Sequence, residues 1–202
     1  MSDKEFILAH NEKYKDFRPF CYREQGLKCY DGVTIGWGCK IGEGTIIYPG
    51  AIIYDDVWIG EDCVVDSGVV IGAPGFSVHL IEGKAVRLKQ VGGVKIGNGC
   101  EIGANTCIDR ASLEGHYTVL GDRVFIDNLC HIAHNVIIQE DVRIAPHVTI
   151  GGSCIIGDHT WLSMGCSIKE HTMIGHNCFV CMNSTVVKNL LPGEKYNSFR
   201  RK

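Results

Sequence analysis

One aliphatic residue recurs at every sixth position through most of this chain, and glycine often follows it directly. A period of six matches neither the 3.6-residue period of an α-helix nor the alternation of an ordinary strand. It predicts hexapeptide repeats, in which short strands wind around a stacked aliphatic core. The repeated positions are Ile35, Ile41, Ile47, Ile53, Ile59, Val65, Ile71, Ile96, Ile102, Ile108, Leu120, Ile126, Ile132, Ile138, Ile144, Ile150, Ile156, Leu162, Ile168, Ile174, Val180 and Val186.

The repeat is interrupted twice. Ile71 and Ile96 are twenty-five residues apart, which is not a multiple of six, so we predict an extruded loop over residues 73–93. Between Arg110 and Thr118 the aliphatic position is filled by Glu114, although the count stays in phase. Functional residues are expected near such breaks, because the repeat itself does not require them.

The organisation follows from this pattern. Residues 1–32 carry aromatics and precede the clean repeat, so we expect them to cap the open end of the solenoid. Residues 33–188 form the β-helix with its extruded loop, and residues 189–202 form a tail. Three hexapeptides make one turn in prisms of this type, so residues eighteen apart should stack. The exposed sheet edges favour association, and we expect a homotrimer.

Charge and hydropathy narrow the functional classes. A formal net charge of −3 gives no electrostatic basis for binding nucleic acid. The polar N-terminus lacks the apolar core of a signal peptide, and no apolar run is long enough for a membrane span. We therefore expect a cytoplasmic protein.

The eleven cysteines do not indicate disulfides or a metal site. Seven of them stand two residues before a repeated aliphatic position, where a thiol acts as a compact hydrophobic side chain. Their number is odd, which does not suit a full set of disulfide pairs. We interpret them as reduced core residues: Cys39, Cys63, Cys100, Cys130, Cys154, Cys166 and Cys178.

Three strings carry a resemblance to a known family: IGAPGF at 71–76, IGANTCIDR at 102–110 and DNLCHIAHN at 127–135. They resemble the UDP-3-O-acylglucosamine N-acyltransferases of lipid A synthesis and shorter relatives that N-acylate nucleotide-linked amino sugars. The resemblance implies an all-β, left-handed parallel β-helix. Unlike the lipid A enzyme, this protein is expected to have no separate uridine-holding N-terminal domain and no long helical C-terminal extension. We therefore expect a nucleotide-linked (dTDP or UDP) deoxyamino sugar as acceptor and acyl-CoA as donor, with no permanently bound cofactor or metal.

The same resemblance implies that His134 is the general base, since a neutral imidazole accepts a proton at cytoplasmic pH. Asp127 is the second catalytic candidate, because it can orient an imidazole or bind the sugar amine; a turn aspartate is the alternative. Its neighbour Asn128 and the residue after the base, Asn135, are candidate substrate contacts.

Eighteen-residue stacking suggests further roles. Gly152 should stand one coil after His134 and leave room for a thioester, with its N–H or that of Ser153 facing the oxyanion. Lys188 should lie about 14 Å further along the column, where the phosphates of acyl-CoA would end. Counting back from His134 gives His116, a candidate substrate contact.

Two residues near the interruptions complete the candidate site. Phe76 could stack on a base or a sugar, although loop aromatics more often only pack. Arg110 could bind a pyrophosphate through two hydrogen bonds; the alternative is a solvated ion pair.

Three other functions remain open from the sequence. O-acetylation would use the same histidine base. A zinc enzyme of the γ-carbonic anhydrase type would need three histidines that converge across a subunit interface, such as His134, His171 and His176. However, His176 is forty-two residues from His134, which is not a multiple of eighteen, so one subunit would place it on another face. A non-catalytic scaffold would not need the two interruptions.

Overall fold

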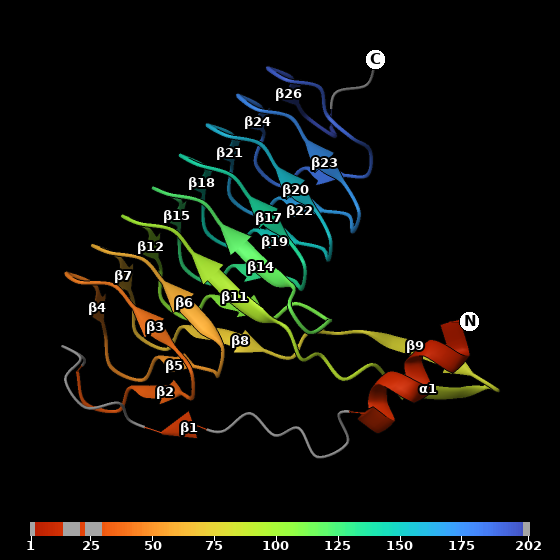
Figure 1. Cartoon of the computed structure of the whole chain (residues 1–202). Coiled ribbons are helices and arrows are strands. Elements are labelled where there is room, and N and C mark those ends of the chain that lie inside the picture. Colours follow the sequence, from red (N-terminus) through yellow and green to blue (C-terminus); the bar gives the residue numbers. More distant parts are fainter. Residues whose placement is uncertain (1–2, 14–20, 23–29, 200–202) are drawn as a thin grey trace.

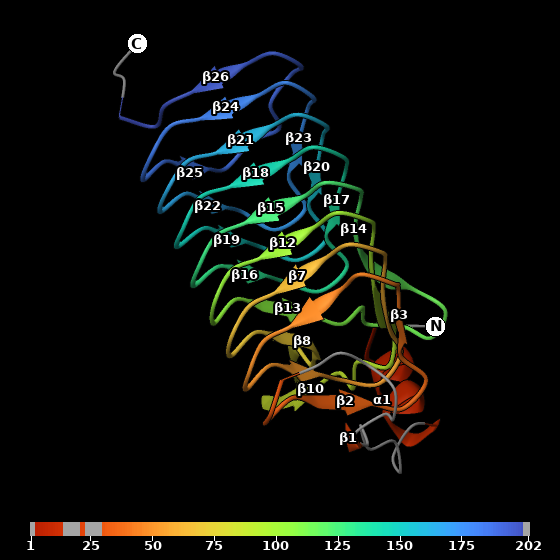
Figure 2. The ribbon, with the colours of Figure 1, turned by 90° about the vertical axis from the view of Figure 1, so that its left-hand side faces the viewer.

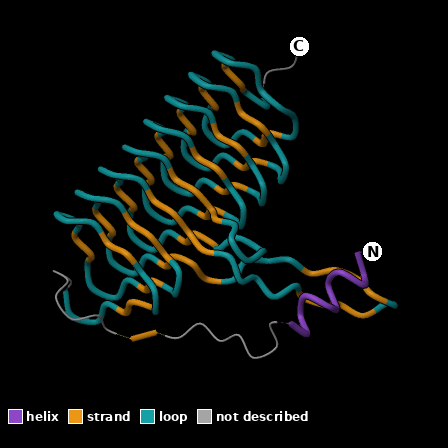
Figure 3. Tube along the Cα trace, viewed as in Figure 1, coloured by secondary structure: helices purple, strands orange, loops and turns teal. Residues whose placement is uncertain are grey.

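The computed structural model describes residues 3–13, 21–22 and 30–199 (Figure 1). Short parallel strands wind into a three-sided prism whose sides are three sheets (Figures 1 and 2). The prediction of an all-β, left-handed parallel β-helix is confirmed. Figure 3 shows how each coil alternates short strands with turns.

Successive strands of the prism pass from the first sheet to the second and then to the third. The first sheet contains β1 (Cys21–Tyr22), β2 (Thr34–Gly36), β5 (Ile52–Ile53), β8 (Val70–Ala73), β13 (Cys107–Asp109), β16 (His131–Ile132), β19 (Thr149–Ile150), β22 (Ser167–Ile168) and β25 (Thr185–Val186). The second contains β3 (Lys40–Ile41), β6 (Val57–Ile59), β11 (Gly93–Ile96), β14 (Tyr117–Leu120), β17 (Ile137–Ile138), β20 (Ile155–Ile156) and β23 (Met173–Ile174). The third contains β4 (Ile46–Ile47), β7 (Val64–Val65), β12 (Glu101–Ile102), β15 (Phe125–Ile126), β18 (Arg143–Ile144), β21 (Trp161–Leu162), β24 (Phe179–Val180) and β26 (Lys195–Tyr196).

The repeated aliphatic residues form the core. Ile132, Ile150 and Ile168 occupy matching positions on β16, β19 and β22, and all three are buried. The seven cysteines predicted to face inward are buried beside them. Stacking of this kind removes apolar surface from water on every coil. Each Å² of apolar surface buried stabilises the fold by roughly 25 cal/mol.

The polar residues and glycines of each repeat lie in the turns of the prism. A residue three positions after the aliphatic one adopts positive φ, as at Asn105, Asn135 and Asn183, and glycine takes the same place at Gly165. Asparagine and glycine adopt this left-handed conformation more readily than most residues. Glycine often follows the aliphatic residue because the position has no room for a side chain. A Cβ at Gly103 would lie 2.6 Å from the backbone of the next coil.

Both interruptions leave the prism at the same edge, where the chain passes from the first sheet to the second (Figure 1). We call this edge the loop corner. It connects β8 to β11 through the first interruption, β13 to β14 through the second, and β16 to β17 on the next coil. Figure 1 shows the first of these excursions projecting to one side of the prism.

The extruded loop is a hairpin of β9 (Val78–Ile81) and β10 (Lys84–Arg87), and α1 (Asp3–Lys13) lies against it. Ile7 of the helix packs with Ile81 and Leu88 in a small apolar cluster. His10 Nε2 is 2.8 Å from the carbonyl of Lys89. The helix therefore covers the hairpin, whereas we expected residues 1–32 to cap the open end. Of that segment, β1 pairs with β2 on the first coil; residues 14–20 and 23–29 lie outside the described residues.

The second interruption inserts six residues into a coil. Ile108 pairs with Ile132, twenty-four residues away, instead of the eighteen that separate Ile132 from Ile150. Six residues make one repeat, so the aliphatic positions still recur every six residues. The residues that stack across this coil are, however, twenty-four apart and not eighteen. In the described part of the chain, no helix is long and apolar enough to cross a membrane.

Candidate active site at the loop corner

His134 stands at the loop corner, directly after β16. It lines a pocket of about 400 Å³ together with Phe76, Asp109, His131, Gly152 and Glu170. Phe76 comes from the start of the extruded loop, lines the pocket and is 82 % exposed. The structure thus brings three predicted site residues together: His134, Phe76 and Gly152.

The imidazole of His134 is held in one tautomer. The backbone N–H of Ser112 donates to Oδ1 of Asn135 at 3.0 Å, which fixes this atom as the amide oxygen. The same oxygen lies 3.1 Å from Nδ1 of His134. Because an amide oxygen can only accept, Nδ1 carries the proton and donates it to Asn135. Nε2 is then the unprotonated nitrogen, the form that a general base requires.

The second interruption supplies the residues that hold Asn135. Ser112 also donates its hydroxyl to Asn135 Oδ1 at 2.9 Å, and the backbone N–H of Asn135 donates to Thr118 Oγ1 at 2.9 Å. Asn135 was predicted to contact substrate. The structure gives it a different position, behind the imidazole, where it orients His134.

Gly152 lies against the other side of the imidazole, as the stacking predicted. A Cβ at this position would be 2.7 Å from Cε1 and 2.8 Å from Nε2 of His134. Its neighbour Ser153 uses its N–H in the prism, donating to the carbonyl of His134 at 3.0 Å. Ser153 is therefore not an oxyanion donor, and this part of the prediction is corrected.

Lys188 does not line the His134 pocket. It is exposed, and its Nζ lies 3.5 Å from Oε1 of Glu194. Its role toward acyl-CoA phosphates stays a prediction.

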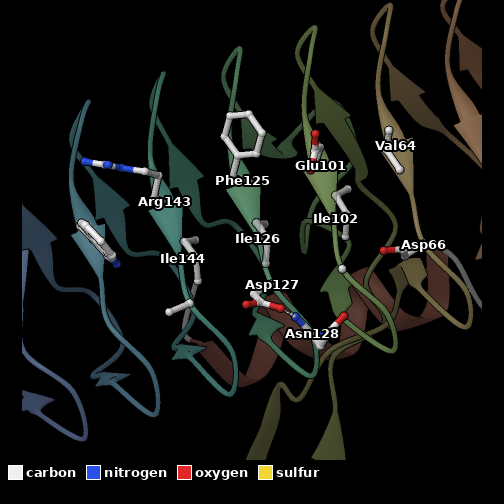
Figure 4. Close-up of a pocket in the computed structure, with 13 residues that line it drawn as sticks. Val64, Asp66, Glu101, Ile102, Phe125, Ile126, Asp127, Asn128, Arg143 and Ile144 are labelled. Carbon is white, nitrogen blue, oxygen red and sulfur yellow. Dashed lines mark hydrogen bonds between the residues drawn. The ribbon is translucent and has the colours of Figure 1, made fainter.

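Asp127 and Asn128 lie elsewhere, in a groove on the third sheet of about 420 Å³ (Figure 4). Oδ1 of Asp127 accepts the N–H of Asn128 at 2.7 Å, and Oδ1 of Asn128 accepts the N–H of Ala104 at 2.6 Å. Within one chain Asp127 therefore does not reach the imidazole of His134, which corrects the predicted pair.

Arg110 is an interior residue. Its side chain is fully buried, with Nε donating to the carbonyl of Gly92 at 2.9 Å and a terminal nitrogen 3.2 Å from Oδ2 of Asp55. A guanidinium with no exposed surface cannot bind a pyrophosphate, so the predicted substrate contact is wrong. The residue stabilises the strand ends beneath the pocket.

His116 is also displaced from its predicted place. Since Ile108 pairs with Ile132, the position one coil before His134 belongs to Arg110. His116 is exposed and lies 3.2 Å from the carbonyl of Glu114 through Nδ1. It lines a separate pocket with Phe6 and His10 of α1, so it is not part of the His134 site.

The zinc alternative gains no support from this arrangement. His171 lines the His134 pocket, but His176 follows β23 and does not. Across the described ranges, no three histidine, cysteine or acidic side chains converge as a metal site would require.

Sequence reasoning missed Asp109 and His131. Asp109 is 5 % exposed, and its Oδ2 lies 3.6 Å from Nε2 of His131. Burial raises the pKa of the Asp109 carboxyl above its usual value, while His131, His134 and Arg87 act in the opposite direction. The string at 102–110 contained this aspartate, but only the fold reveals that it faces His134's pocket.

The sequence matches two models of known protein families. A model described as bacterial transferase hexapeptide (six repeats) matches residues 38–73, 117–152 and 153–188, more than half of the chain. This chain belongs to the bacterial transferase hexapeptide family. A second model, the hexapeptide repeat of succinyl-transferase, matches residues 86–110.

Curated relatives of this hexapeptide protein include two named UDP-3-O-acylglucosamine N-acyltransferase. The one from Shewanella denitrificans is 47 % identical over 85 residues, 42 % of this chain and 24 % of the relative. The one from Polynucleobacter asymbioticus is 37 % identical over 129 residues, 59 % of this chain and 36 % of the relative. The chain thus spans about a quarter to a third of the curated relatives that it matches.

Solved structures share the fold of this family member. A UDP-N-acetylglucosamine acyltransferase from Campylobacter jejuni superimposes with a TM-score of 0.70 at 23 % identity, covering 82 % of this chain and 69 % of its own. LpxA from Acinetobacter baumannii also gives a TM-score of 0.70, at 17 % identity, covering 81 % and 68 %. At these identities the likeness concerns the β-helix alone.

Proposed function

We propose that this protein transfers an acyl group from an acyl-CoA thioester to the amino group of a nucleotide-linked deoxyamino sugar. The observation that carries the proposal is the fixed tautomer of His134, whose Nδ1 donates to Asn135 and whose Nε2 is left as a base at the pocket. The curated relatives that match the chain are N-acyltransferases by name, which supports an amine as acceptor.

The reaction follows from these positions. The amine nitrogen attacks the thioester carbonyl carbon, and Nε2 of His134 takes the proton that this nitrogen must lose. The carbon–sulfur bond then breaks, and the imidazolium returns the proton to the leaving thiolate. The products are the amide and free CoA. The N–H of Gly152 is the proposed donor to the oxyanion that forms on the carbonyl oxygen.

Substrate placement is part of the same proposal. Phe76 stacks on the base or sugar of the acceptor at the mouth of the pocket. The thioester enters beside the imidazole of His134, for which the missing side chain of Gly152 leaves room. The pantetheine arm runs along the column toward Lys188, which meets the CoA phosphates.

Asp127 and Asn128 act across an interface in this proposal. We propose that the protein assembles in the cytoplasm as a homotrimer. The third-sheet groove, shown for one copy in Figure 4, would face the loop corner of the next copy. Asp127 and Asn128 then contact the acceptor held beside the neighbour's base. Light scattering of the purified protein tests the assembly, and a monomer that remains fully active would remove this interface from the mechanism.

The function is tested by mass spectrometry of products. The protein is incubated with UDP- and dTDP-linked amino sugars, their hydroxyl counterparts, and acyl-CoAs of different chain length. The expected product is an amide on an amino sugar. Acylation of hydroxyl acceptors alone would instead assign O-acyl transfer, which the same histidine base can perform. No acylated product with any donor would reject acyl transfer.

A further inference from the structure

A buried carboxylate lies in the wall of the His134 pocket, and its nearest basic group is the imidazole of His131, an ion-pair partner when protonated. Asp109 ends β13 and is 5 % exposed. Its Oδ2 makes no hydrogen bond with any residue that the structure describes. Nε2 of His131 is 3.6 Å away, which is beyond hydrogen-bond range. A buried carboxylate without a donor is costly, so a cation held in the pocket beside it gains binding energy from the attraction of the two charges.

The extruded loop holds this carboxylate against the pocket. The backbone of Gly75 passes so close that a Cβ on it would overlap Asp109 Oδ2. Gln90 fixes Gly75 by accepting its N–H at 2.6 Å, and Arg87 donates to the carbonyl of Gly75 at 2.6 Å. Oδ2 is therefore sealed from bulk water on the loop side, where water cannot screen its charge.

The remaining lining of the pocket suits a cation. None of the described residues that line it is a lysine or an arginine, and Glu170 adds a second carboxylate. The nearby guanidinium of Arg87 is engaged by the carbonyls of Pro74 and Gly75, at 3.1 and 2.6 Å. The imidazoles of His131, on β16, and of His134, two residues beyond the end of β16, both act electrostatically on Asp109.

We propose that Asp109 makes this pocket selective for a primary amine over a hydroxyl group, by pairing with the ammonium form of the acceptor beside His134. The inference rests on the proposed function, because it names the acceptor chemistry of the same site. A hydroxyl group carries no charge for the carboxylate to attract, so it gains less from the same position. The arriving cation also favours the ionised carboxylate, opposing the effect of burial.

The proton balance is consistent with this order of events. The paired ammonium gives one proton to Nε2 of His134, which passes it to solvent. The neutral nitrogen then forms the bond to the thioester carbon. Its second proton passes through the same imidazole to the departing thiolate as the carbon–sulfur bond breaks. Asp109 keeps its charge throughout and is a specificity-determining residue.

Asp109→Asn tests the proposal, because the amide has the same size and no charge. Asp158→Asn, on a different edge of the prism, is the matched control. Calorimetry measures binding of matched pairs: UDP-glucosamine with UDP-glucose, and a dTDP-linked 4-amino-4,6-dideoxyglucose with dTDP-6-deoxyglucose. The wild type and the control should bind the amino member of the fitting pair about 10- to 100-fold more tightly, and Asp109→Asn should lose most of that preference.

Two results would overturn the proposal: a wild type that fails to prefer the amino member of either pair, or an Asp109→Asn protein that keeps the full preference. A melting temperature of Asp109→Asn at or above that of the wild type shows that the fold is intact, since an amide costs less to bury than a carboxylate. Acyl transfer is measured separately. If the wild type prefers the amine but transfers no acyl group, the proposed function alone is rejected. If the wild type transfers an acyl group and Asp109→Asn keeps the full preference, the role of Asp109 alone is rejected.

Discussion

A methyl group added at Gly152 would overlap the imidazole of His134, since a Cβ there lies 2.7 Å from Cε1. Gly152→Ala should therefore displace the ring and lower kcat by roughly 100-fold, the effect of a misplacement of about 1 Å. Circular dichroism and melting should change little. In a double-mutant cycle, Gly152→Ala should add almost nothing to His134→Ala; an additive loss would mean that Gly152 acts independently of the base.

His134 itself should be needed for turnover. His134→Ala or His134→Asn should lower kcat by about 10²–10⁴, the usual contribution of general acid–base catalysis. The melting temperature should stay close to that of the wild type, because the side chain lies in the pocket and not in the aliphatic core. A variant with more than half of the wild-type kcat would show that the acceptor amine attacks without this base.

Asn135 should matter through the tautomer of His134. Asn135→Gly removes the amide oxygen but keeps a residue that tolerates the φ of 61° at this turn. We expect kcat to fall roughly 10-fold or more, because the imidazole loses the contact that fixes its orientation. Asn183→Gly makes the same change at a turn with a φ of 55°, far along the prism, and serves as control. Equal losses in both variants would assign the effect to the turn.

Arg110 should be needed for folding stability and not for binding substrate. Arg110→Met leaves Asp55 without its buried partner and should lower the free energy of unfolding by about 3–5 kcal/mol. Chemical denaturation measures this loss. Adding Asp55→Asn should restore part of the stability, because it removes the unpaired charge. Weaker binding of the acceptor with unchanged stability would return Arg110 to the substrate site.

The core thiols should be unreactive in the folded protein. Burial raises the pKa of Cys166 to about 11 from 9.0, so its neutral thiol is favoured until pH rises through that value. This stabilising contribution is fully present below pH 9 and is lost between pH 9 and about 11. Alkylation of Cys166 by iodoacetamide at pH 8 should therefore be slow until the protein is denatured. Reductant should not change the melting temperature; a reductant-sensitive melting curve would indicate a disulfide.

The aliphatic period was sufficient to predict the prism, because one residue in six must face its axis whatever the others are. It also predicted that Gly152 lies beside His134, since no interruption separates the two coils. The same count failed for His116. Six inserted residues leave the period intact while shifting the stacking, so only the strand pairing reveals that Arg110 holds that position.

Other features depend on contacts that a period cannot encode. The packing of Ile7 against Ile81 joins segments far apart in the chain. The unmet hydrogen bonding of Asp109 depends on where the backbone of Gly75 passes. An outward aspartate in a hexapeptide looks the same in sequence whether it meets water or a sealed pocket wall.

Because both interruptions leave the prism at the loop corner, changes in the length of these segments are independent of substitutions along the strands. Substitutions along the strands must satisfy the coils above and below, so they are constrained collectively. Segments that leave at the loop corner can lengthen or shorten while every strand keeps its partners, because the chain re-enters the prism in register. These segments can therefore be exchanged during evolution without renewed selection of the core.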